Sequence, residues 1–403
     1  MRPSDTPAPF TLRLPGADGG LLTHRLSSTA SLPIAPSGTR FNRIAYSAAH
    51  VVADPRAAID PSGECAIDWD ATLAYRRHLW SLGLGVAEAM DTAQRGMGLD
   101  WPTSLTLIRR SLDAARDVPG ALIASGCGTD QLPIEAARST DDVIRAYEEQ
   151  MAAIEALGGK LIVMASRALV RVATGPADYE RVYERVLRQS KQPVILHWLG
   201  DMFDPALAGD GGSADADRAM DTALAVIASN PGKVDGIKIS LLDKGREIAL
   251  RRRLPAGVRM YTGDDFNYAE LIAGDGVGSA ANQRHSDALL GIFDAIAPAA
   301  SAALAALAAG DEARFHAILA PTVPLSRHIF AAPTRFYKTG VVFMAWLNGH
   351  QNHFTMVGGQ QSARSLLHFT ELFRLADAAG LIERPELAVQ RMKQLLALHG
   401  IEG

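Results

Sequence analysis

The sequence predicts an α/β protein built on a closed (β/α)8 barrel, with a short N-terminal β arm and a C-terminal helical extension. After Phe41, short apolar segments of strand length alternate with longer segments of helical periodicity, at repeats of about 35 to 45 residues. Eight such βα units close into a barrel. An open doubly wound sheet is the alternative, but it usually carries a glycine-rich turn after its first strand. Here that position reads Tyr46-Ser47-Ala48-Ala49-His50, which contains no glycine.

The elements follow in the order that this fold requires. Residues 1–40 are expected to form the arm, a hairpin of strands 10–14 and 21–26 around Gly19-Gly20. The barrel is expected over 41–297. Its strands are expected to begin at Arg43, Gly85, Ala121, Lys160, Pro193, Val234, Val258 and Gly276. Helices are expected at 70–82, 140–156, 178–189, 215–229 and 286–296.

The extension, residues 298–403, is rich in alanine and leucine and has helical periodicity. Several prolines separate its segments, and helices are expected at 338–348 and 362–379. We expect these helices to pack on the barrel.

Composition excludes several classes of function. The 403 residues carry 40 Lys and Arg against 44 Asp and Glu, a formal charge of −4, so no basic surface for nucleic acid is expected. No apolar stretch is long enough to span a membrane, and no secretory signal is visible at the start. The two cysteines, Cys65 and Cys127, form no disulfide framework or CxxC metal site. We therefore expect a cytoplasmic protein.

Lys238 is the residue most suited to chemistry. It lies between two isoleucines near the end of the sixth predicted strand, at the end of the barrel where active sites occur. A lysine that points into the barrel loses solvation, which favours the neutral amine that attacks a carbonyl to form a Schiff base. The alternative is a lysine paired with a carboxylate such as Asp264 or Asp265. The local sequence does not decide between the two.

Several short motifs occur in a recognisable order. They are Gly126-Cys127-Gly128-Thr129, Pro193-Val194-Ile195-Leu196, Gly236-Ile237-Lys238, Tyr261-Thr262-Gly263-Asp264-Asp265 and Gly276-Val277-Gly278-Ser279-Ala280-Ala281-Asn282. With this order and spacing, the chain from Phe41 to about Ile296 resembles the dihydrodipicolinate synthase and N-acetylneuraminate lyase family, the Schiff-base class I aldolase-like barrels. The resemblance implies that Lys238 is the Schiff-base lysine.

The departures from the family are also informative. His197 stands where members have the tyrosine that relays protons, and an imidazole can also move a proton. The family's Gly-Thr-Thr-Gly-Glu loop corresponds to Asp91-Thr92-Ala93-Gln94-Arg95, in which Thr92 keeps the first threonine and Ala93 replaces the second. The arginine that many members carry after the tyrosine is replaced near Met202. These changes argue against dihydrodipicolinate synthase activity itself.

We therefore expect a Schiff-base-forming lyase, aldolase or dehydratase that acts on a polar keto acid or sugar-derived carbonyl compound. Lys238 would be the nucleophile and His197 the proton shuttle. The expected substrate-binding residues are Thr92, Asp91, Gln94, Asp264, Asn282, His50 and His285. No cofactor or metal is expected, and the resemblance implies a homo-oligomer, a dimer or a tetramer.

Two alternatives remain open at this point. One is a metal-dependent barrel aldolase or isomerase, with ligands drawn from His50, Glu88, Asp91, His197 and His285. The other is a family member that binds a ligand without converting it.

Overall fold

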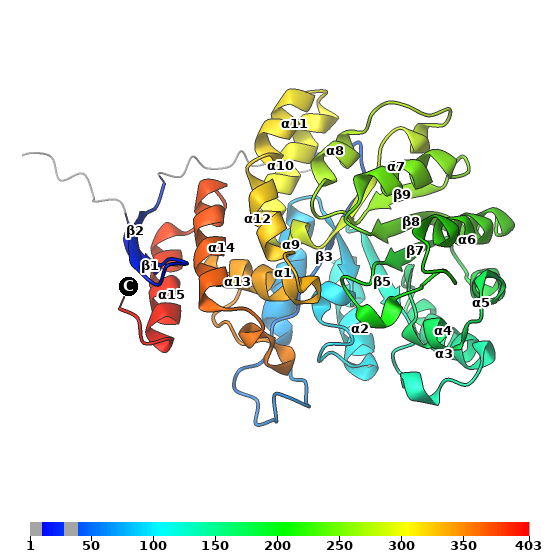
Figure 1. The fold of residues 1–403 in the computed structure, drawn as a ribbon, viewed down its shortest axis with the longest axis horizontal. Coiled ribbons are helices and arrows are strands. Elements are labelled where there is room, and N and C mark those ends of the chain that lie inside the picture. The colour runs from blue at the N-terminus through cyan, green and yellow to red at the C-terminus, as the bar shows by residue number, and fades with distance from the viewer. Residues whose placement is uncertain (1–9, 28–38, 403) are drawn as a thin grey trace, which may run out of the picture.

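The computed structural model describes residues 10–27 and 39–402, and its main body is a closed barrel of eight parallel strands (Figure 1). The strands neighbour one another in the order β10-β3-β4-β5-β6-β7-β8-β9. Their bounds are β3 (Ala45–Ala48), β4 (Gly85–Glu88), β5 (Ile123–Cys127), β6 (Leu161–Met164), β7 (Val194–Leu199), β8 (Val234–Ser240), β9 (Arg259–Thr262) and β10 (Asp287–Leu290). The predicted fold class is confirmed.

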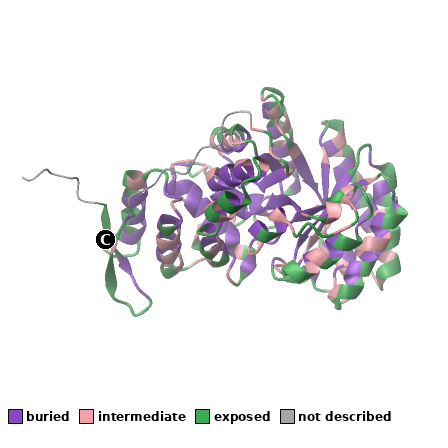
Figure 2. Ribbon diagram, turned by 90° about the horizontal axis from the view of Figure 1, so that it is seen from above, coloured by how far each residue is buried: buried purple, intermediate pink, exposed green. Residues whose placement is uncertain are grey.

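The interior of the barrel is filled by side chains from alternate strand positions, as the two-residue period of a strand requires. A buried cluster inside the ring contains Tyr46, Ala87, Ile162, Tyr261 and Leu289. Strand residues between these positions face the surrounding helices and form a second apolar layer. Figure 2 shows the barrel strands as buried and the outer faces of the helices as exposed. Packed apolar side chains therefore close the barrel interior below the carboxyl ends of the strands.

Helices and short 3-10 turns connect the barrel strands, and several helices begin with a side-chain cap. In α3, for example, Ser139 and Asp142 form a reciprocal capping box. The connecting elements are α1 (Trp69–Ser81), η1 (Asp91–Ala93), α2 (Trp101–Arg116), η2 (Ile134–Ala136), α3 (Thr140–Ala156), α4 (Arg167–Val172), α5 (Pro176–Gln189), η3 (Pro205–Leu207), α6 (Ala216–Ser229), α7 (Lys244–Arg253), α8 (Tyr268–Ala273), η4 (Ala281–Gln283) and α9 (Ile292–Ala295). Within the described ranges, no helix is long and apolar enough to cross a bilayer.

The first seven strands begin within two residues of their predicted starts, but the eighth prediction is wrong. The strand expected at Gly276 begins at Asp287, and the helix expected at 286–296 is this strand followed by the short α9. Gly276 and Gly278 adopt φ values of 67° and 142°, which a continuous strand does not allow. The apolar segment 288–290 fits the strand instead, because it is buried throughout.

The hairpin of β1 (Thr11–Pro15) and β2 (Leu21–Arg25) agrees with the predicted arm. It packs against α14 and α15 at the end of the molecule far from α5 and α6 (Figure 1). There the Asp377 carboxylate accepts hydrogen bonds from the Ser27 backbone N–H and contacts the His24 ring. Residues 1–9 and 28–38 of the expected arm lie outside the described residues.

The C-terminal extension consists of helices that pack on one side of the barrel. Its elements are α10 (Ala297–Ala308), α11 (Glu312–Leu319), α12 (Thr322–Ile329), η5 (Thr334–Phe336), α13 (Tyr337–Leu347), η6 (Val357–Ser362), α14 (Leu366–Ala378) and α15 (Pro385–Leu398). Buried side chains of α13 and of the barrel element α9 belong to one apolar cluster. This packing brings the start of α13 to the carboxyl ends of the barrel strands.

Candidate active site

Lys238 lies at the carboxyl end of β8 and points into the barrel. It is in register with His197 on β7 and with Tyr261 on β9, and Tyr261 belongs to the interior cluster. Only 7% of Lys238 is exposed. A Cβ atom on Gly263 would meet the Ser240 hydroxyl, the Ile239 carbonyl oxygen at 2.5 Å and Cε of Lys238 at 2.8 Å, so glycine at this position leaves room for β8 and for the lysine chain.

The environment of Lys238 favours a neutral amine. Burial lowers the pKa of Lys238 to about 8, although the nearby carboxylates of Asp265 and Asp91 act in the opposite direction. Among the described residues, no carboxylate lies within ion-pair distance of its Nζ atom. The amine is therefore buried near two acids without being bound to either.

Asp265, rather than Asp264, is the acid next to this lysine. Burial raises the pKa of Asp265 to about 7, and its Oδ1 accepts a hydrogen bond of 2.8 Å from the Ile292 backbone N–H. The Asp264 carboxylate is instead occupied by the backbone N–H groups of Phe266 and Asn267 and by the Asn267 side chain. The expected role of Asp264 in orienting substrate does not fit this geometry, because its oxygens hold the loop together.

His197 is a neutral imidazole beside Lys238. Burial, together with the positive charge of Lys238, holds the pKa of His197 well below its usual range. Its Nε2 lies 3.3 Å from Oγ of Ser240, on the inward face of β8. A neutral imidazole has one donor and one acceptor nitrogen, so this group can move a proton within the site.

The loop after β4 contributes Asp91 and Thr92, and residues of the extension hold both. Oδ1 of Asp91 accepts a hydrogen bond of 2.9 Å from Nζ of Lys338, and Oγ1 of Thr92 lies 2.7 Å from the Tyr337 hydroxyl. Burial raises the pKa of Tyr337 well above its usual value, and the Asp91 charge adds to this effect. Tyr337 therefore stays protonated at neutral pH.

The prediction from sequence did not include Tyr337 and Lys338. The sequence contained one signal, because Lys338 is the only charged residue in the mainly apolar segment 337–347. In the structure this lysine is 1% exposed. A buried lysine needs a partner, and here that partner is Asp91, 247 residues away in the chain.

Four of the expected substrate-binding residues have other contacts. The His50 ring is bound at Nδ1 by Asp294 and packs on Tyr75, outside the barrel interior. Gln94 donates from its side chain to the Val357 carbonyl oxygen at 2.7 Å and so anchors η6.

Asn282 and His285 lie at the amino end of the barrel, where Asn282 donates to the carbonyl oxygens of Pro255 and Val258. Both residues line a hollow of about 410 Å³ together with Asp287, the first residue of β10. Because catalysis in this fold occurs at the carboxyl ends of the strands, neither residue reaches Lys238. The prediction placed both residues near Lys238 because it expected the eighth strand to begin at Gly276 rather than at Asp287.

The five residues considered as metal ligands do not come together. The Glu88 carboxylate is fully buried in an ion pair with Arg76 at 2.8 Å, the His50 ring is bound by Asp294, and His285 lies at the amino end of the barrel. Over residues 10–27 and 39–402, no group of three or more His, Cys, Asp or Glu side chains is arranged to hold a metal ion.

A cleft of about 680 Å³ opens beside His197 and Asp91. The loops that follow β4, β5, β6 and β7 form its walls. This volume is within the range of about 300–1,000 Å³ typical of ligand pockets.

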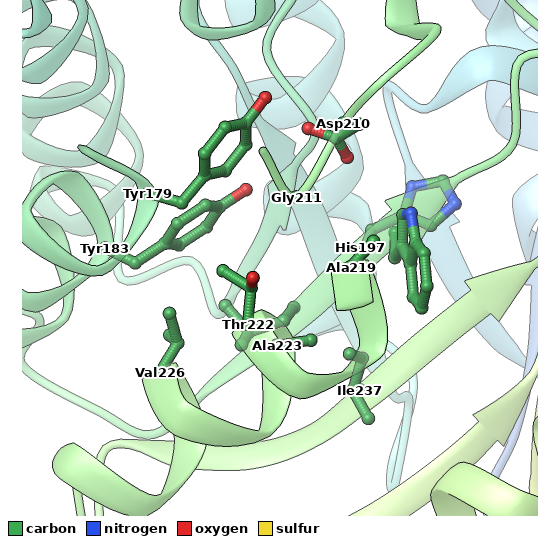
Figure 3. A pocket seen from close by; sticks show the side chains of 12 residues that line it. Tyr179, Tyr183, His197, Asp210, Gly211, Ala219, Thr222, Ala223, Val226 and Ile237 are labelled. Atoms are coloured by element: carbon green, nitrogen blue, oxygen red, sulfur yellow. The ribbon is translucent and has the colours of Figure 1, made fainter. Parts of the chain in front are cut away.

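A second cavity of about 50 Å³ lies on the outer side of β7 and β8. Figure 3 shows Tyr179 and Tyr183 from α5 on the side of this cavity nearest Asp210, whose pKa burial raises to about 7. This cavity has room for a few water molecules only, so the larger cleft is the candidate substrate site.

Comparison with known proteins agrees with this architecture. The family model described as "Protein of unknown function (DUF993)" matches residues 12–401. No curated protein matches the chain. Among solved structures, a putative dihydrodipicolinate synthetase from Pseudomonas aeruginosa has a TM-score of 0.61 and 16% identity, and the match covers 84% of this chain and 99% of that one.

Two further structures share the fold. The 4-hydroxy-tetrahydrodipicolinate synthase from Methylacidiphilum fumariolicum SolV has a TM-score of 0.61 and 13% identity, covering 87% of this chain and 99% of its own. YagE from E. coli K12, a prophage protein of the dihydrodipicolinic acid synthase family in complex with pyruvate, has a TM-score of 0.59 and 13% identity, covering 90% and 100%. The resemblance to this family is thus confirmed for the fold.

Proposed function

The chain belongs to the DUF993 family, and from that premise we propose that it is a Schiff-base-forming lyase or aldolase. Its substrate is a polar keto acid or a sugar-derived carbonyl compound. One observation carries the proposal above all others: Lys238 is a buried lysine with a lowered pKa at the carboxyl end of a barrel strand, with no carboxylate bound to it among the described residues. Its neighbour His197 lines the large cleft.

In this reaction the neutral amine of Lys238 attacks the carbonyl carbon of the substrate and forms a carbinolamine. Asp265, whose pKa of about 7 leaves it partly protonated at neutral pH, donates a proton to the departing hydroxyl, which leaves as water. The iminium ion that remains accepts the electron pair of the bond that breaks at the adjacent carbon. In an aldol cleavage that bond is the Cα–Cβ bond. In a dehydration it is the Cα–H bond, whose proton passes to a base of the site, and the enamine that forms then expels the β-hydroxyl group, which takes up a proton and leaves as water.

The neighbouring residues support the proton transfers. His197 takes the proton that the reacting amine or a substrate hydroxyl releases, because its lowered pKa leaves an unprotonated nitrogen available. Thr92, held by Tyr337, and Asp91, held by Lys338, fix the polar groups of the substrate next to the lysine. Asp264 and Asn282 have no part in this scheme.

Reduction with cyanoborohydride tests the proposal. The protein is incubated with pyruvate, 2-oxopentanoate or dihydroxyacetone, reduced, digested and analysed by mass spectrometry. We expect a stable adduct on Lys238 that is absent in Lys238→Ala and retained in Lys244→Ala, which removes an exposed lysine of α7. No adduct on Lys238 with any of the three compounds, together with turnover that EDTA abolishes, would contradict the Schiff-base mechanism and favour a metal-dependent one.

A further inference from the structure

Two arginines line the cleft, and one of them has no free donor left. Arg95 donates from Nε and Nη2 to Asp130, from Nη1 to the carbonyl oxygens of Gly126 and Ala89, and from Nη2 to Gln150. A guanidinium has five N–H donors, and these contacts use all of them. Arg95 is therefore unable to bind a carboxylate of the substrate.

The second arginine has donors available. Arg167 donates from Nε to Asp204, and its Nη atoms form no hydrogen bond with the described part of the chain. They pass over the backbone of Gly96, where a Cβ would lie 3.1 Å from Nη2. The side chain of Arg167 is 35% exposed. Its free N–H groups and the oxygens of Asp204 thus lie next to each other at the cleft wall.

The overall charge of the cleft disfavours an anionic group. Its charged lining consists of the two arginines and the carboxylates Asp91, Asp100, Asp130, Asp204 and Glu135. Even when Lys338 is counted against Asp91, the carboxylates outnumber the cations by two. A carboxylate or phosphate on the far end of a substrate would meet repulsion from this excess.

A hydroxyl group fits the remaining polar atoms better than a charged group does. A hydroxyl accepts from the free N–H groups of Arg167 and also donates to Asp204, whose Oδ2 already accepts from Arg167 Nε and whose Oδ1 accepts from the Ala206 backbone N–H at 3.1 Å. An ammonium or guanidinium only donates and would leave the Arg167 donors unpaired. A carboxylate would accept from Arg167 but would lie beside the negative charge of Asp204, which repels it.

We propose that the Arg167–Asp204 pair is a subsite for hydroxyl groups on the part of the substrate distant from its carbonyl. The substrate is then a polyhydroxylated carbonyl compound without a second acidic group. This inference rests on the proposed function, since the substrate is placed by its bond to Lys238.

Five-carbon 2-oxo acids with different tails test the subsite. The probes are 2-oxopentanoate, 4,5-dihydroxy-2-oxopentanoate, 2-oxoglutarate and 5-guanidino-2-oxopentanoate. For each, the concentration that gives half-maximal reduced adduct on Lys238 is measured by mass spectrometry. We expect this concentration to be about tenfold lower for the dihydroxy probe than for 2-oxopentanoate, as one or two hydrogen bonds provide, and highest for 2-oxoglutarate.

Variants connect the preference to these residues. Arg167→Met and Asp204→Asn should each bring the dihydroxy probe to within about threefold of 2-oxopentanoate. Arg181→Met, which breaks an exposed ion pair with Asp141 outside the cleft, should keep the full preference. If Arg167→Met does not fold, Asp204→Asn alone decides the result.

The outcomes separate the two proposals. Three results would each overturn the subsite and leave the lysine chemistry intact. In the first, adducts form equally well with all tails; in the second, the carboxylate or guanidino tail is preferred; in the third, the hydroxyl preference survives both variants. Absence of any adduct on Lys238 in the unmodified protein would overturn the proposed function and the subsite with it.

Discussion

Replacing Lys238 with methionine should stabilise the protein at neutral pH. The methionine chain fills nearly the same volume but carries no charge, and Lys238 is buried without an ion pair within the described residues. Keeping a cation in such a place opposes folding. A residue retained for catalysis is expected to show this conflict between stability and function.

The pKa values determine the size of the effect and its dependence on pH. The pKa of lysine falls from 10.5 in the unfolded chain to about 8 in the fold. At about 1.4 kcal/mol per unit, this costs the fold on the order of 3 kcal/mol at pH 7. Between pH 8 and 10.5 the unfolded chain binds more protons than the fold does, so the stability of the wild type rises with pH across that window. The advantage of the variant is therefore full below pH 8 and disappears above 10.5.

The response of Asp265 changes the stabilisation expected for Lys238→Met only slightly. In the variant it loses the charge of Lys238, which lowers its pKa in the wild type. At pH 7 this carboxyl is already close to half protonated, because its pKa is about 7. Complete protonation then adds only a small penalty, well below the gain from removing the lysine charge.

Urea unfolding at pH 7.0 and pH 9.5, followed by circular dichroism, measures the effect. Lys338→Met is the matched control, because this lysine is equally buried but paired with Asp91. Its loss should destabilise the protein by about 3–5 kcal/mol. If Lys238→Met is no more stable than the wild type at pH 7, or if its advantage grows between pH 7.0 and 9.5, the reasoning about the buried amine is wrong.

Two further changes act on the same lysine. Asp265→Asn removes the first of the two charges that raise the pKa of Lys238, so the pH midpoint of adduct formation should move below 8; an unchanged midpoint would show that the two groups do not interact. Gly263→Ala places a methyl group 2.5 Å from the Ile239 carbonyl oxygen and 2.8 Å from Cε of Lys238, so the end of β8 and the lysine chain must both shift, and adduct formation should slow by about tenfold or more, measured by mass spectrometry at pH 8. Gly175→Ala, where a Cβ meets nothing within 4 Å, should leave the rate unchanged, and equal rates for both alanine variants would contradict the steric argument.

The barrel and the position of Lys238 could be predicted because both follow from local periodicity. Strand residues alternate between faces, so a lysine between Ile237 and Ile239 has to face opposite to them. Ile237 and Ile239 belong to the apolar layer outside the ring, and Lys238 faces the interior. The same periodicity located seven of the eight strands.

The rest of the site depends on features that periodicity does not contain. A short motif around Gly276 resembles a family strand, but the positive φ values of its glycines make it a loop. The prediction therefore placed Asn282 and His285 at the carboxyl end of the barrel, whereas they lie at its amino end. Asp264 and Asp265 lie next to each other in a turn, where alternation does not apply. Only the hydrogen bonds of the loop decide which carboxylate faces the lysine.

The contribution of the extension depends on contacts between distant parts of the chain. Tyr337 reaches Thr92 across 245 residues, and neither residue carries a pattern that indicates the other. Packing of α13 on α9 makes this contact, and apolar packing constrains volume rather than the identity of a polar neighbour. Sequence periodicity therefore predicts that helices follow the barrel, without predicting that one of them completes its polar end.

Two buried lysines in the same site show how this fold separates structure from chemistry. Lys338 is 1% exposed, and its Nζ donates to Asp91 and to the carbonyl oxygen of Arg335, so its charge has a partner in the fold. Lys238 is 7% exposed and lies near the same Asp91 but has no such partner in the described structure. Because Lys338 already engages Asp91, this carboxylate is less able to hold Lys238 as a cation. The paired lysine of the extension thereby helps to keep the barrel lysine neutral enough to act as a nucleophile.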